Sequence, residues 1–554
     1  MYRLFFNVNG AAFISPMSNK ILKQVEKLTS IGISLSKERN LAKLLELIMI
    51  GAKQITYADG GTLYLVKGKQ LKFEIMRTDS LDFAMGGTTG NPITLAPIPL
   101  FDAEGNANLK NISAYAAVTG KTANIADAYA AHGFDFQGTK LYDQQNNYRS
   151  QSFLTVPMRN HEDEIIGVLQ LINAQDPKTE KLTAFSIRDQ KLAESLASQA
   201  AIAITNFQLI SDLRELLENF IKIIAQAIDE KSPYTGGHCR RVPEIAMMLA
   251  DAINDQDHGP FKATKFSEQE LYELNIAALL HDCGKITTPV HVVDKATKLE
   301  TIFDRIELIA ERVETLKKEV EIKLLNTRLN SEDPELIKQA ETQYHSAIKQ
   351  LEQDFEFICK ANKGSEYMGD DAVEKIQQIA RHSWYDSKGQ QRFLLTQEEI
   401  DNLCIRKGTL TDAERSIVNH HIVMTQQMLG ALRFPNHLKN VPEIAGNHHE
   451  RMDGKGYPNG LQGNQLSVQA RMMCIADVFE ALTAADRPYK KAMQLSTAIK
   501  ILGNMKQESH IDPDIFDVFV SEKVYLKYAK RFLKDEQIDE VDIKNIPGFS
   551  GLKN

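Results

Sequence analysis

The sequence predicts a multidomain, mostly helical protein, with an α+β first part and an all-α second part. Three observations support this fold class. A chain of 554 residues is too long for one hydrophobic core, so several folding units are expected. Alternating apolar residues, typical of strands, occur in pairs of runs within residues 17–188. Helical periodicity dominates the remainder of the chain.

Composition and charge exclude several classes of function. Hydrophobic residues make up 43% and charged residues 25% of the chain, as in ordinary globular proteins. The net charge of −8 disfavours general nucleic-acid binding, which needs a broad basic surface. The five cysteines are scattered without a CxxC pair, which indicates a reducing, cytoplasmic location. No apolar run of about 18 residues occurs, so no membrane-spanning helix is expected.

The first part of the chain reads as a tail followed by an α+β domain. Residues 1–16 are expected to form an unstructured tail, with Met17 as an alternative initiator. A helical pattern from Met17 to about Met49 leads into two alternating runs around residues 67–69, which predict a hairpin. A second pair of strands is joined by the polar turn 160–163. Strands flanked by helices predict an α+β domain over 17–188.

The stretch from "AAVTGKTANIADAY" to "YRSQSFLTVPMRNHEDEIIGVLQLINA" resembles a GAF domain, a small-molecule sensor fold. The resemblance implies an unknown small-molecule ligand. Some nucleotide-binding members carry an Asn-Lys…Phe-xxx-Asp-Glu signature, and two of its positions differ here. The corresponding residues are Asn173, Ala174, Phe185, Asp189 and Gln190. A domain used only for dimerisation or packing is the alternative.

Residues 189–230 read as one long linker helix without internal Pro or Gly. Its apolar residues follow a 3-4-3-4 spacing, which predicts the seam of a parallel two-helix coiled coil and hence a homodimer. An intramolecular packing face is the alternative. The seam residues are Ile210, Leu213, Leu217, Phe220 and Ile224.

Residues 292–405 are rich in charge and strongly helical, and they predict an antiparallel helical hairpin. Asp333 is expected to cap a helix that begins at Pro334. The hairpin could shield a site, bind a partner or be a tolerated insertion. The apolar residues of the two predicted helices are Ile302, Ile306, Ile309, Val313, Leu316 and Val320, and then Tyr344, Ile348, Leu351, Phe355 and Ile358.

Histidines and aspartates in the second half form a candidate metal centre. They are His238, His281, Asp282, His421, His448, His449 and Asp477. Imidazole and carboxylate ligands suit Fe, Mn or Zn, and the absence of cysteine from the set disfavours a structural zinc. The set exceeds what one ion needs, but it can hold two ions if Asp282 bridges them. Such a pair of ions favours attack of an activated water at phosphorus.

The motifs "HDCGK", "HHERMDGKGYPNGLQG" and "ADVFEALTAADRPYK" closely resemble the HD-GYP family of bacterial cyclic dinucleotide phosphodiesterases. The resemblance covers about residues 215–290 and 406–525. It predicts an all-α HD bundle whose first part is 231–291 and whose second part, with a C-terminal tail, is 406–554. The insertion 292–405 separates the two parts.

Carried over by position, the resemblance assigns His238, His281, Asp282 and Asp477 to one divalent ion. It assigns Asp282, His421, His448 and His449 to the other, with iron favoured and manganese as the alternative. Alignment of "LTDAERSIVNHH" selects His421 over its neighbour His420. Some members bind a third metal through a glutamate at the position of Tyr234, so two ions are expected here.

The same resemblance assigns catalytic roles to Asp282 and Lys285. It assigns substrate contacts to Lys285, Arg487, Lys490, Gly456 and Tyr457. We call the loop that contains Gly456, Tyr457 and Pro458 the GYP loop. Its glycines, Gly454 and Gly456, would allow the backbone to approach the substrate closely, and Pro458 would stiffen the end of the loop.

The function expected is hydrolysis of cyclic di-GMP to pGpG, and further to GMP, through a metal-bridging hydroxide under control of the GAF domain. A phosphodiesterase for cyclic GMP-AMP or another nucleotide keeps the site and changes the substrate. A non-catalytic scaffold would use the GYP loop or the insertion to recruit a signalling partner protein.

Overall fold

The computed structural model describes residues 16–231, 237–364, 367–485 and 493–551, with side chains described from Gln24 onward. The chain divides into two compact units, Met1–Leu217 and Glu218–Asn554. No helix in the described ranges is long and apolar enough to cross a membrane. The predicted tail falls outside the described residues, apart from Pro16.

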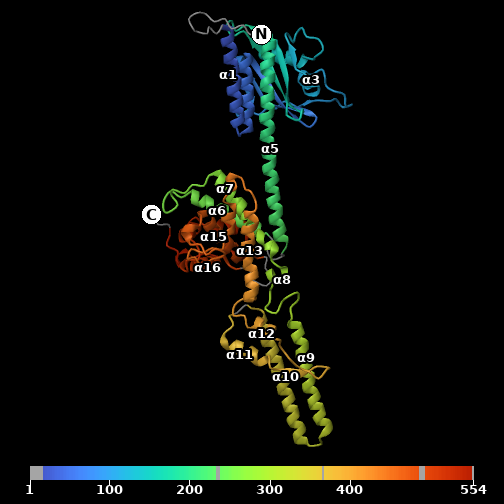
Figure 1. The fold of residues 1–554 in the computed structure, drawn as a ribbon, viewed down its shortest axis with the longest axis vertical. Helices are drawn as coiled ribbons and strands as arrows, with labels where there is room; N and C mark the ends of the chain where they lie inside the picture. Colours follow the sequence, from blue (N-terminus) through green and yellow to red (C-terminus); the bar gives the residue numbers. More distant parts are fainter. Residues whose placement is uncertain (1–15, 232–236, 365–366, 486–492, 552–554) are drawn as a thin grey trace, which may run out of the picture. The chain divides into compact units, whose positions relative to one another are not determined.

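The first unit is the predicted α+β domain, built around one antiparallel sheet (Figure 1). The strands run in the order β3-β2-β1-β7-β6-β5, with β4 paired to β2 and β8 to β7. Its helices are α1 (Pro16–Lys37), α2 (Leu41–Thr56), α3 (Ile112–Thr119) and α4 (Gln137–Asn146), with a 3₁₀ turn η1 (Asp79–Leu81). Its strands are β1 (Ala58–Lys67), β2 (Gln70–Thr78), β3 (Phe83–Gly86), β4 (Ile98–Pro99), β5 (Ala123–Ile125), β6 (Phe153–Arg159), β7 (Ile165–Gln175) and β8 (Leu182–Thr183). Both predicted strand pairs, β1–β2 and β6–β7, are confirmed.

The sheet is covered on both faces. Side chains alternate along each strand, so successive residues of β1 join different cores on the two faces. On β1, Leu63 and Leu65 join the larger core, which includes residues of α2 and of the long helix α5 (Ile187–Lys231). Between them, Tyr64 joins a smaller core with Ala114 and Ala116 of α3 on the opposite face. The helices therefore cover the sheet from two sides.

The positions of the nucleotide-binding signature make local hydrogen bonds. Asn173 adopts a left-handed backbone conformation, with φ of 57°. Its side-chain oxygen accepts from the Gln151 N–H, and its amide donates to the Arg149 carbonyl and the Tyr148 hydroxyl. Asn173 thereby holds residues 148–152 against β7. Asp189 accepts from the Ser186 N–H at the start of α5.

Helix α5 (Ile187–Lys231) is continuous over the predicted linker. Residues from Ala193 to Ile204 belong to the core of the first unit, whereas Ile221, Ala225 and Ile228 belong to the core of the second. The predicted seam residues are all exposed in this structure. Their exposed fractions are 68% for Ile210, 66% for Leu213, 37% for Leu217, 56% for Phe220 and 41% for Ile224.

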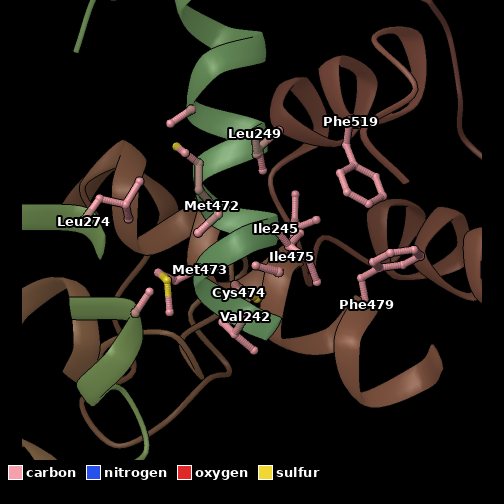
Figure 2. Close-up of a cluster of buried hydrophobic side chains, with 14 of the residues drawn as sticks. Val242, Ile245, Leu249, Leu274, Met472, Met473, Cys474, Ile475, Phe479 and Phe519 are labelled. Carbon is pink, nitrogen blue, oxygen red and sulfur yellow. The ribbon is translucent and has the colours of Figure 1, made fainter. Parts of the chain in front are cut away.

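The second unit is mostly helical, with one large core. Val242, Ile245 and Leu249 of α6 face Ile475 and Phe479 of α15 (Figure 2). The bundle consists of α6 (His238–Asn254), α7 (Glu268–Leu280), α8 (Val290–Val293), α13 (Asp412–Gly430), α14 (Val441–Gly446), α15 (Val468–Thr483), α16 (Leu495–Gln507), α17 (Pro513–Ser521) and α18 (Val524–Phe532). Its 3₁₀ turns are η2 (Cys283–Thr287), η3 (Asn436–Leu438), η4 (Gly463–Gln465), η5 (Asp535–Gln537) and η6 (Ile543–Asn545).

The insertion contains the predicted hairpin, formed by α9 (Ile306–Asn330) and α10 (Pro334–Asn362). Asp333 caps α10 as predicted, because its side chain accepts from the Glu335 N–H. The prediction for Ile302 is wrong. This residue precedes α9 and is 92% exposed.

A hairpin alone is also an incomplete description of the insertion, because α11 (Asp370–Ile379), α12 (Gln397–Leu403) and a two-stranded sheet pack beside it. The strands of this sheet are β9 (Ser383–Tyr385) and β10 (Gln391–Phe393). The sequence predicts an all-α second half, whereas these strands make the insertion a mixture of helix and strand.

The insertion is fastened to the bundle through Lys295. The ammonium of this buried lysine donates to both carboxylate oxygens of Glu414, at 2.9 and 2.8 Å, and to Asn402 at 2.8 Å. Glu414 also belongs to the capping box at the start of α13. The beginning and the end of the insertion thus meet at the helix that carries His421.

Candidate metal centre

The first group of predicted ligands comes from three places in the bundle. His238 is the first residue of α6, His281 and Asp282 follow α7, and Asp477 lies on α15. His238 Nε2 is 3.2 Å from His281 Nε2, 3.2 Å from Asp282 Oδ2 and 3.2 Å from Asp477 Oδ1. The four side chains are buried and converge on one point.

The second group contains His421 of α13 with His448 and His449, which follow α14. Their ligand atoms all lie within 4.8 Å of one another. Asp282 lies between the groups: its Oδ2 is 3.3 Å from His281 Nε2, and its Oδ1 is 3.4 Å from His421 Nε2. One oxygen of this carboxylate therefore faces each group.

Three histidines are oriented by the same local contact. The Nδ1 atoms of His281, His421 and His448 lie 2.7, 2.5 and 2.7 Å from the backbone carbonyls three residues earlier. A carbonyl can only accept, so each Nδ1 carries the proton and each Nε2 presents a lone pair to the centre. The buried Nε2 atoms of His421 and His448 have no hydrogen-bond partner among the described residues.

Glu480 orients the remaining histidine of the first group, and the sequence analysis missed it. Its Oε2 lies 2.5 Å from His238 Nδ1, and its Oε1 accepts from Arg241 Nε at 2.7 Å. Glu480 follows Asp477 by three residues on α15, which places both on one helix face. That spacing was the available signal.

These residues fit divalent metal ions. Ligand atoms about 2.1 Å from a shared ion lie roughly 3.0–3.4 Å from one another, as the atoms around His238 do. Lone pairs of buried nitrogen and oxygen repel one another at this distance unless a cation or proton lies between them. The orphaned nitrogens of His421 and His448 are accounted for in the same way.

Electrostatics in the centre keep Asp282 ionised and two of the imidazoles, His448 and His449, neutral. Burial alone would raise the pKa of Asp282, but Lys285 and His281 hold it well below its usual range. Burial lowers the pKa of His448 well below its usual range and that of His449 to about 4. Both imidazoles are therefore neutral near pH 7, which is the form that binds metal.

Lys285 lies at the edge of the centre on η2. Its Nζ donates to Asp282 Oδ2 at 2.6 Å, and its side chain is 26% exposed. Burial alone would lower the pKa of Lys285, but Asp282 and Asp477 raise it, so the ammonium stays charged. A permanent cation thus stands where a phosphate could reach it.

Gly284 explains how α13 comes close enough to bring His421 to Asp282. A Cβ atom at this position would lie 1.9 Å from the His421 carbonyl oxygen and 2.6 Å from the Thr425 nitrogen. The Gly284 N–H donates to the Thr425 hydroxyl at 3.0 Å. Only glycine permits this contact between η2 and α13.

The GYP loop is held by Glu450, whose buried carboxylate accepts from the backbone N–H groups of Asn459 and Leu461. Gly454 has a φ of +75°, and a Cβ on Gly456 would lie 2.4 Å from the Glu450 Cα. The close approach at Gly456 is therefore to the loop's own backbone. The Tyr457 ring stacks on His449 with centroids 4.9 Å apart, before a cis bond to Pro458.

The structure thus brings together all the predicted metal ligands, with Lys285 and Tyr457 beside them. His420, the neighbour not chosen, is exposed. The predicted substrate contacts Arg487 and Lys490 lie outside the described residues, as does Tyr234.

Comparison with known families matches both halves of the chain. A model of the GAF domain matches residues 40–204, and two models of the HD domain match residues 235–380 and 397–515. A solved GAF domain of an Acinetobacter phosphoenolpyruvate-protein phosphotransferase covers 34% of this chain and 98% of its own, at 14% identity and a TM-score of 0.25. The GAF assignment rests on the family model.

Relatives in the curated proteins are cyclic dinucleotide phosphodiesterases. A 3'3'-cGAMP-specific phosphodiesterase of Vibrio cholerae serotype O1 is 38% identical over 140 residues, covering 25% of this chain and 27% of that protein. A cyclic di-GMP phosphodiesterase of Pseudomonas aeruginosa is 39% identical over 120 residues, covering 22% of this chain and 28% of that protein. The chain thus spans little more than a quarter of the length of these relatives.

Proposed function

We propose that this chain, which combines an N-terminal GAF domain with a C-terminal HD domain, is a metal-dependent phosphodiesterase acting on cyclic dinucleotides. The observation that carries the proposal is the position of Asp282, which directs one oxygen to each of two groups of histidines. A shared carboxylate is the arrangement that holds two ions close together.

His238, His281, Asp282 and Asp477 would hold one ion, and Asp282, His421, His448 and His449 the other. Divalent ions bound there, iron or manganese by resemblance, would supply a water activated at neutral pH and a counter-charge for the phosphate. The buried imidazoles and carboxylates exclude bulk water, which strengthens every electrostatic interaction in the centre.

Lys285 would bind the scissile phosphate. Its ammonium is fixed by Asp282 on one side and exposed on the other, so it can contact an anionic oxygen without leaving its place. Tyr457, stacked on His449, would form one wall of the substrate site, and Gly456 lets the loop fold tightly behind it. Arg487 and Lys490 would contact the outer phosphates, as the HD-GYP resemblance implies.

Cyclic di-GMP is the substrate we propose, with pGpG as the first product and GMP as the second. A mixed cyclic GMP-AMP dinucleotide is the alternative, and the identity to the Vibrio cholerae enzyme supports it equally. Metal ligands and Lys285 act on the phosphodiester, which both substrates share. Discrimination must come from base contacts elsewhere in the site.

In the cell, a ligand of the GAF domain would regulate this activity, and a homodimer would form through the seam on α5. A scaffold that binds a signalling protein through the GYP loop or the insertion is the competing function. A scaffold does not need two groups of buried histidines whose Nε2 lone pairs face one centre. The presence of these groups favours the enzyme.

The test measures metal content and turnover on one anaerobic preparation. The protein should contain about two irons or manganeses per chain and should hydrolyse cyclic di-GMP or cyclic GMP-AMP. Asp282→Ala should abolish turnover and lower the metal content. His421→Ala should lose one ion, whereas the adjacent exposed His420→Ala should keep both ions and full activity.

Two outcomes would contradict the proposal. A folded protein that binds no metal under any condition would exclude the dinuclear centre. Full metal content without hydrolysis of either dinucleotide, with and without candidate GAF ligands, would favour the scaffold.

A further inference from the structure

The last turn of α5 contacts two segments next to ligands of the first group: the start of α6, which carries His238, and η2, which follows His281 and Asp282. Asp229 Oδ1 accepts a hydrogen bond from the Cys239 N–H at 3.1 Å. Lys231, the last residue of the helix, donates from Nζ to the carbonyl oxygens of Lys285 at 2.9 Å, Thr288 at 2.6 Å and Ile286. Two side chains of one helical turn therefore reach the start of α6 and the end of η2.

Asp229 completes a helix start that has no cap of its own. The N-cap residue of α6 is Gly237, which makes no side-chain capping bond, and His238 and Cys239 are the first two helical residues. Their N–H groups have no partner within the helix and attract negative charge. The buried carboxylate of Asp229 satisfies one of these groups, one residue away from the ligand His238.

At η2, Lys231 supplies a positive charge to backbone acceptors, whereas Asp229 supplies a negative charge to a backbone donor. The carbonyls of Lys285, Ile286 and Thr288 converge where this 3₁₀ turn ends, and a concentration of carbonyl oxygens attracts positive charge. The ammonium of Lys231 satisfies all three carbonyls. It thereby fixes the backbone of Lys285, whose side chain points to Asp282.

We propose that Asp229 and Lys231 are positioning residues of the proposed phosphodiesterase: the end of α5 places His238 for metal binding and Lys285 for phosphate binding. Ile221, Ala225 and Ile228 anchor this end of α5 in the bundle core. The same helix belongs to the core of the first unit. A movement of α5 would therefore act on the centre through these two contacts.

The test for Lys231 is a double-mutant cycle with Lys285, on the full-length metal-loaded protein. Lys231→Met should lower kcat about tenfold or more, because small misplacements of a catalytic group have such effects. Lys231→Arg should retain most activity. In a Lys285→Ala background, Lys231→Met should have no further effect, since it acts through Lys285. Lys222→Met, at an exposed position of α5, is the matched control.

Additive effects of Lys231→Met and Lys285→Ala would overturn the proposal for Lys231. So would an unchanged kcat in Lys231→Met. Thermal unfolding of each variant is recorded in parallel, and the Lys231→Arg comparison keeps the test valid if Lys231→Met is destabilised.

Asp229 is tested by metal binding, which needs no substrate. Asp229→Ala should weaken binding of Mn²⁺ to the first group about tenfold or more, whereas Asp229→Asn keeps an acceptor oxygen and should bind nearly as the parent does. Equal affinity of the Ala variant and the parent would overturn the role of Asp229.

Because the roles of Asp229 and Lys231 rest on the proposed function, the experiments must distinguish a wrong role from a wrong function. A parent protein that binds Mn²⁺ but hydrolyses neither cyclic dinucleotide contradicts the phosphodiesterase, while the Mn²⁺ titration still decides the role of Asp229.

Discussion

At the scale of single residues, each of the four buried imidazoles of the centre is oriented by a partner behind it. His238 alone among the four buried histidines uses a carboxylate, Glu480, in place of its own helix carbonyl. Burial alone would raise the pKa of Glu480, but His238 and Arg241 lower it, so it remains ionised. An ionised carboxylate behind a histidine raises the basicity of the nitrogen that faces the metal.

Glu480→Gln should therefore weaken binding at the first group about tenfold to a hundredfold, because an amide orients the ring less strongly and carries no charge. Titration with Mn²⁺ followed by competition with a chelator measures the change. The exposed acid Glu508, changed to Gln, is the control and should not alter the affinity. An affinity equal to that of the parent in Glu480→Gln would assign Glu480 a purely structural role.

The metal ligands could be read from the sequence because they lie in short contiguous motifs. Glu480 follows Asp477 by three residues and shares its helix face, so its spacing offered a signal in the sequence. Lys231 offered none. Lys231 contacts carbonyls 54 to 57 residues away, and backbone carbonyls leave no mark in a sequence. Contacts of this kind become visible only when the tertiary packing is known.

At the scale of elements, the centre depends on how closely α13 lies on η2. Gly284 permits this contact, and Thr425 reinforces it by accepting from the Gly284 N–H and donating to the His281 carbonyl at 3.3 Å. The two helical segments are thus joined next to the ligands His281 and His421.

Gly284→Ala should push α13 away from η2 and cost about 1–3 kcal/mol of unfolding free energy. It should also weaken metal binding at the second group, since the added methyl group meets the carbonyl of His421 itself. Urea unfolding and metal content measure the two effects. Gly430→Ala, at the end of α13 and with no atom outside its own helix backbone within 4 Å of the added carbon, should be neutral. If both substitutions behave alike, the close approach has no role in the centre.

The insertion shows what periodicity can and cannot predict. The apolar faces of α9 and α10 follow from local spacing, and Asp333 and Pro334 mark the start of the second helix correctly. The short strands β9 and β10 are too brief to show a pattern, and the helical spacing was extended to Ile302 although the chain there is not helical. The link between Lys295 and Glu414 joins residues 119 positions apart, beyond any local rule.

At the scale of the whole molecule, α5 carries an apolar surface wider than the predicted seam. Leu209, Leu216 and Ile223 recur every seven residues beside it, and all three are exposed. A stripe of three positions per heptad buries more area than the narrow seam of a two-helix coiled coil. Such a surface is unfavourable in water unless another chain covers it.

Leu213→Asp combined with Leu217→Asp should therefore convert a dimer to a monomer, because two charges would be buried in the seam without partners. Sedimentation equilibrium over a range of protein concentrations measures the change. Ser211→Asp, one residue beyond Ile210 and off the stripe, is the control. A parent protein that is already monomeric at high concentration would exclude this use of the seam.

The contact that three of these histidines make with the carbonyl three residues earlier has a consequence for metal exchange. Because the rings of His281, His421 and His448 are oriented by backbone of their own segments, their pocket is formed by the folded chain and not by the ion. A chelator should strip the protein without unfolding it, and reloading should need no refolding. The identity of the bound metal would then be set by supply at the moment of loading and not by the fold.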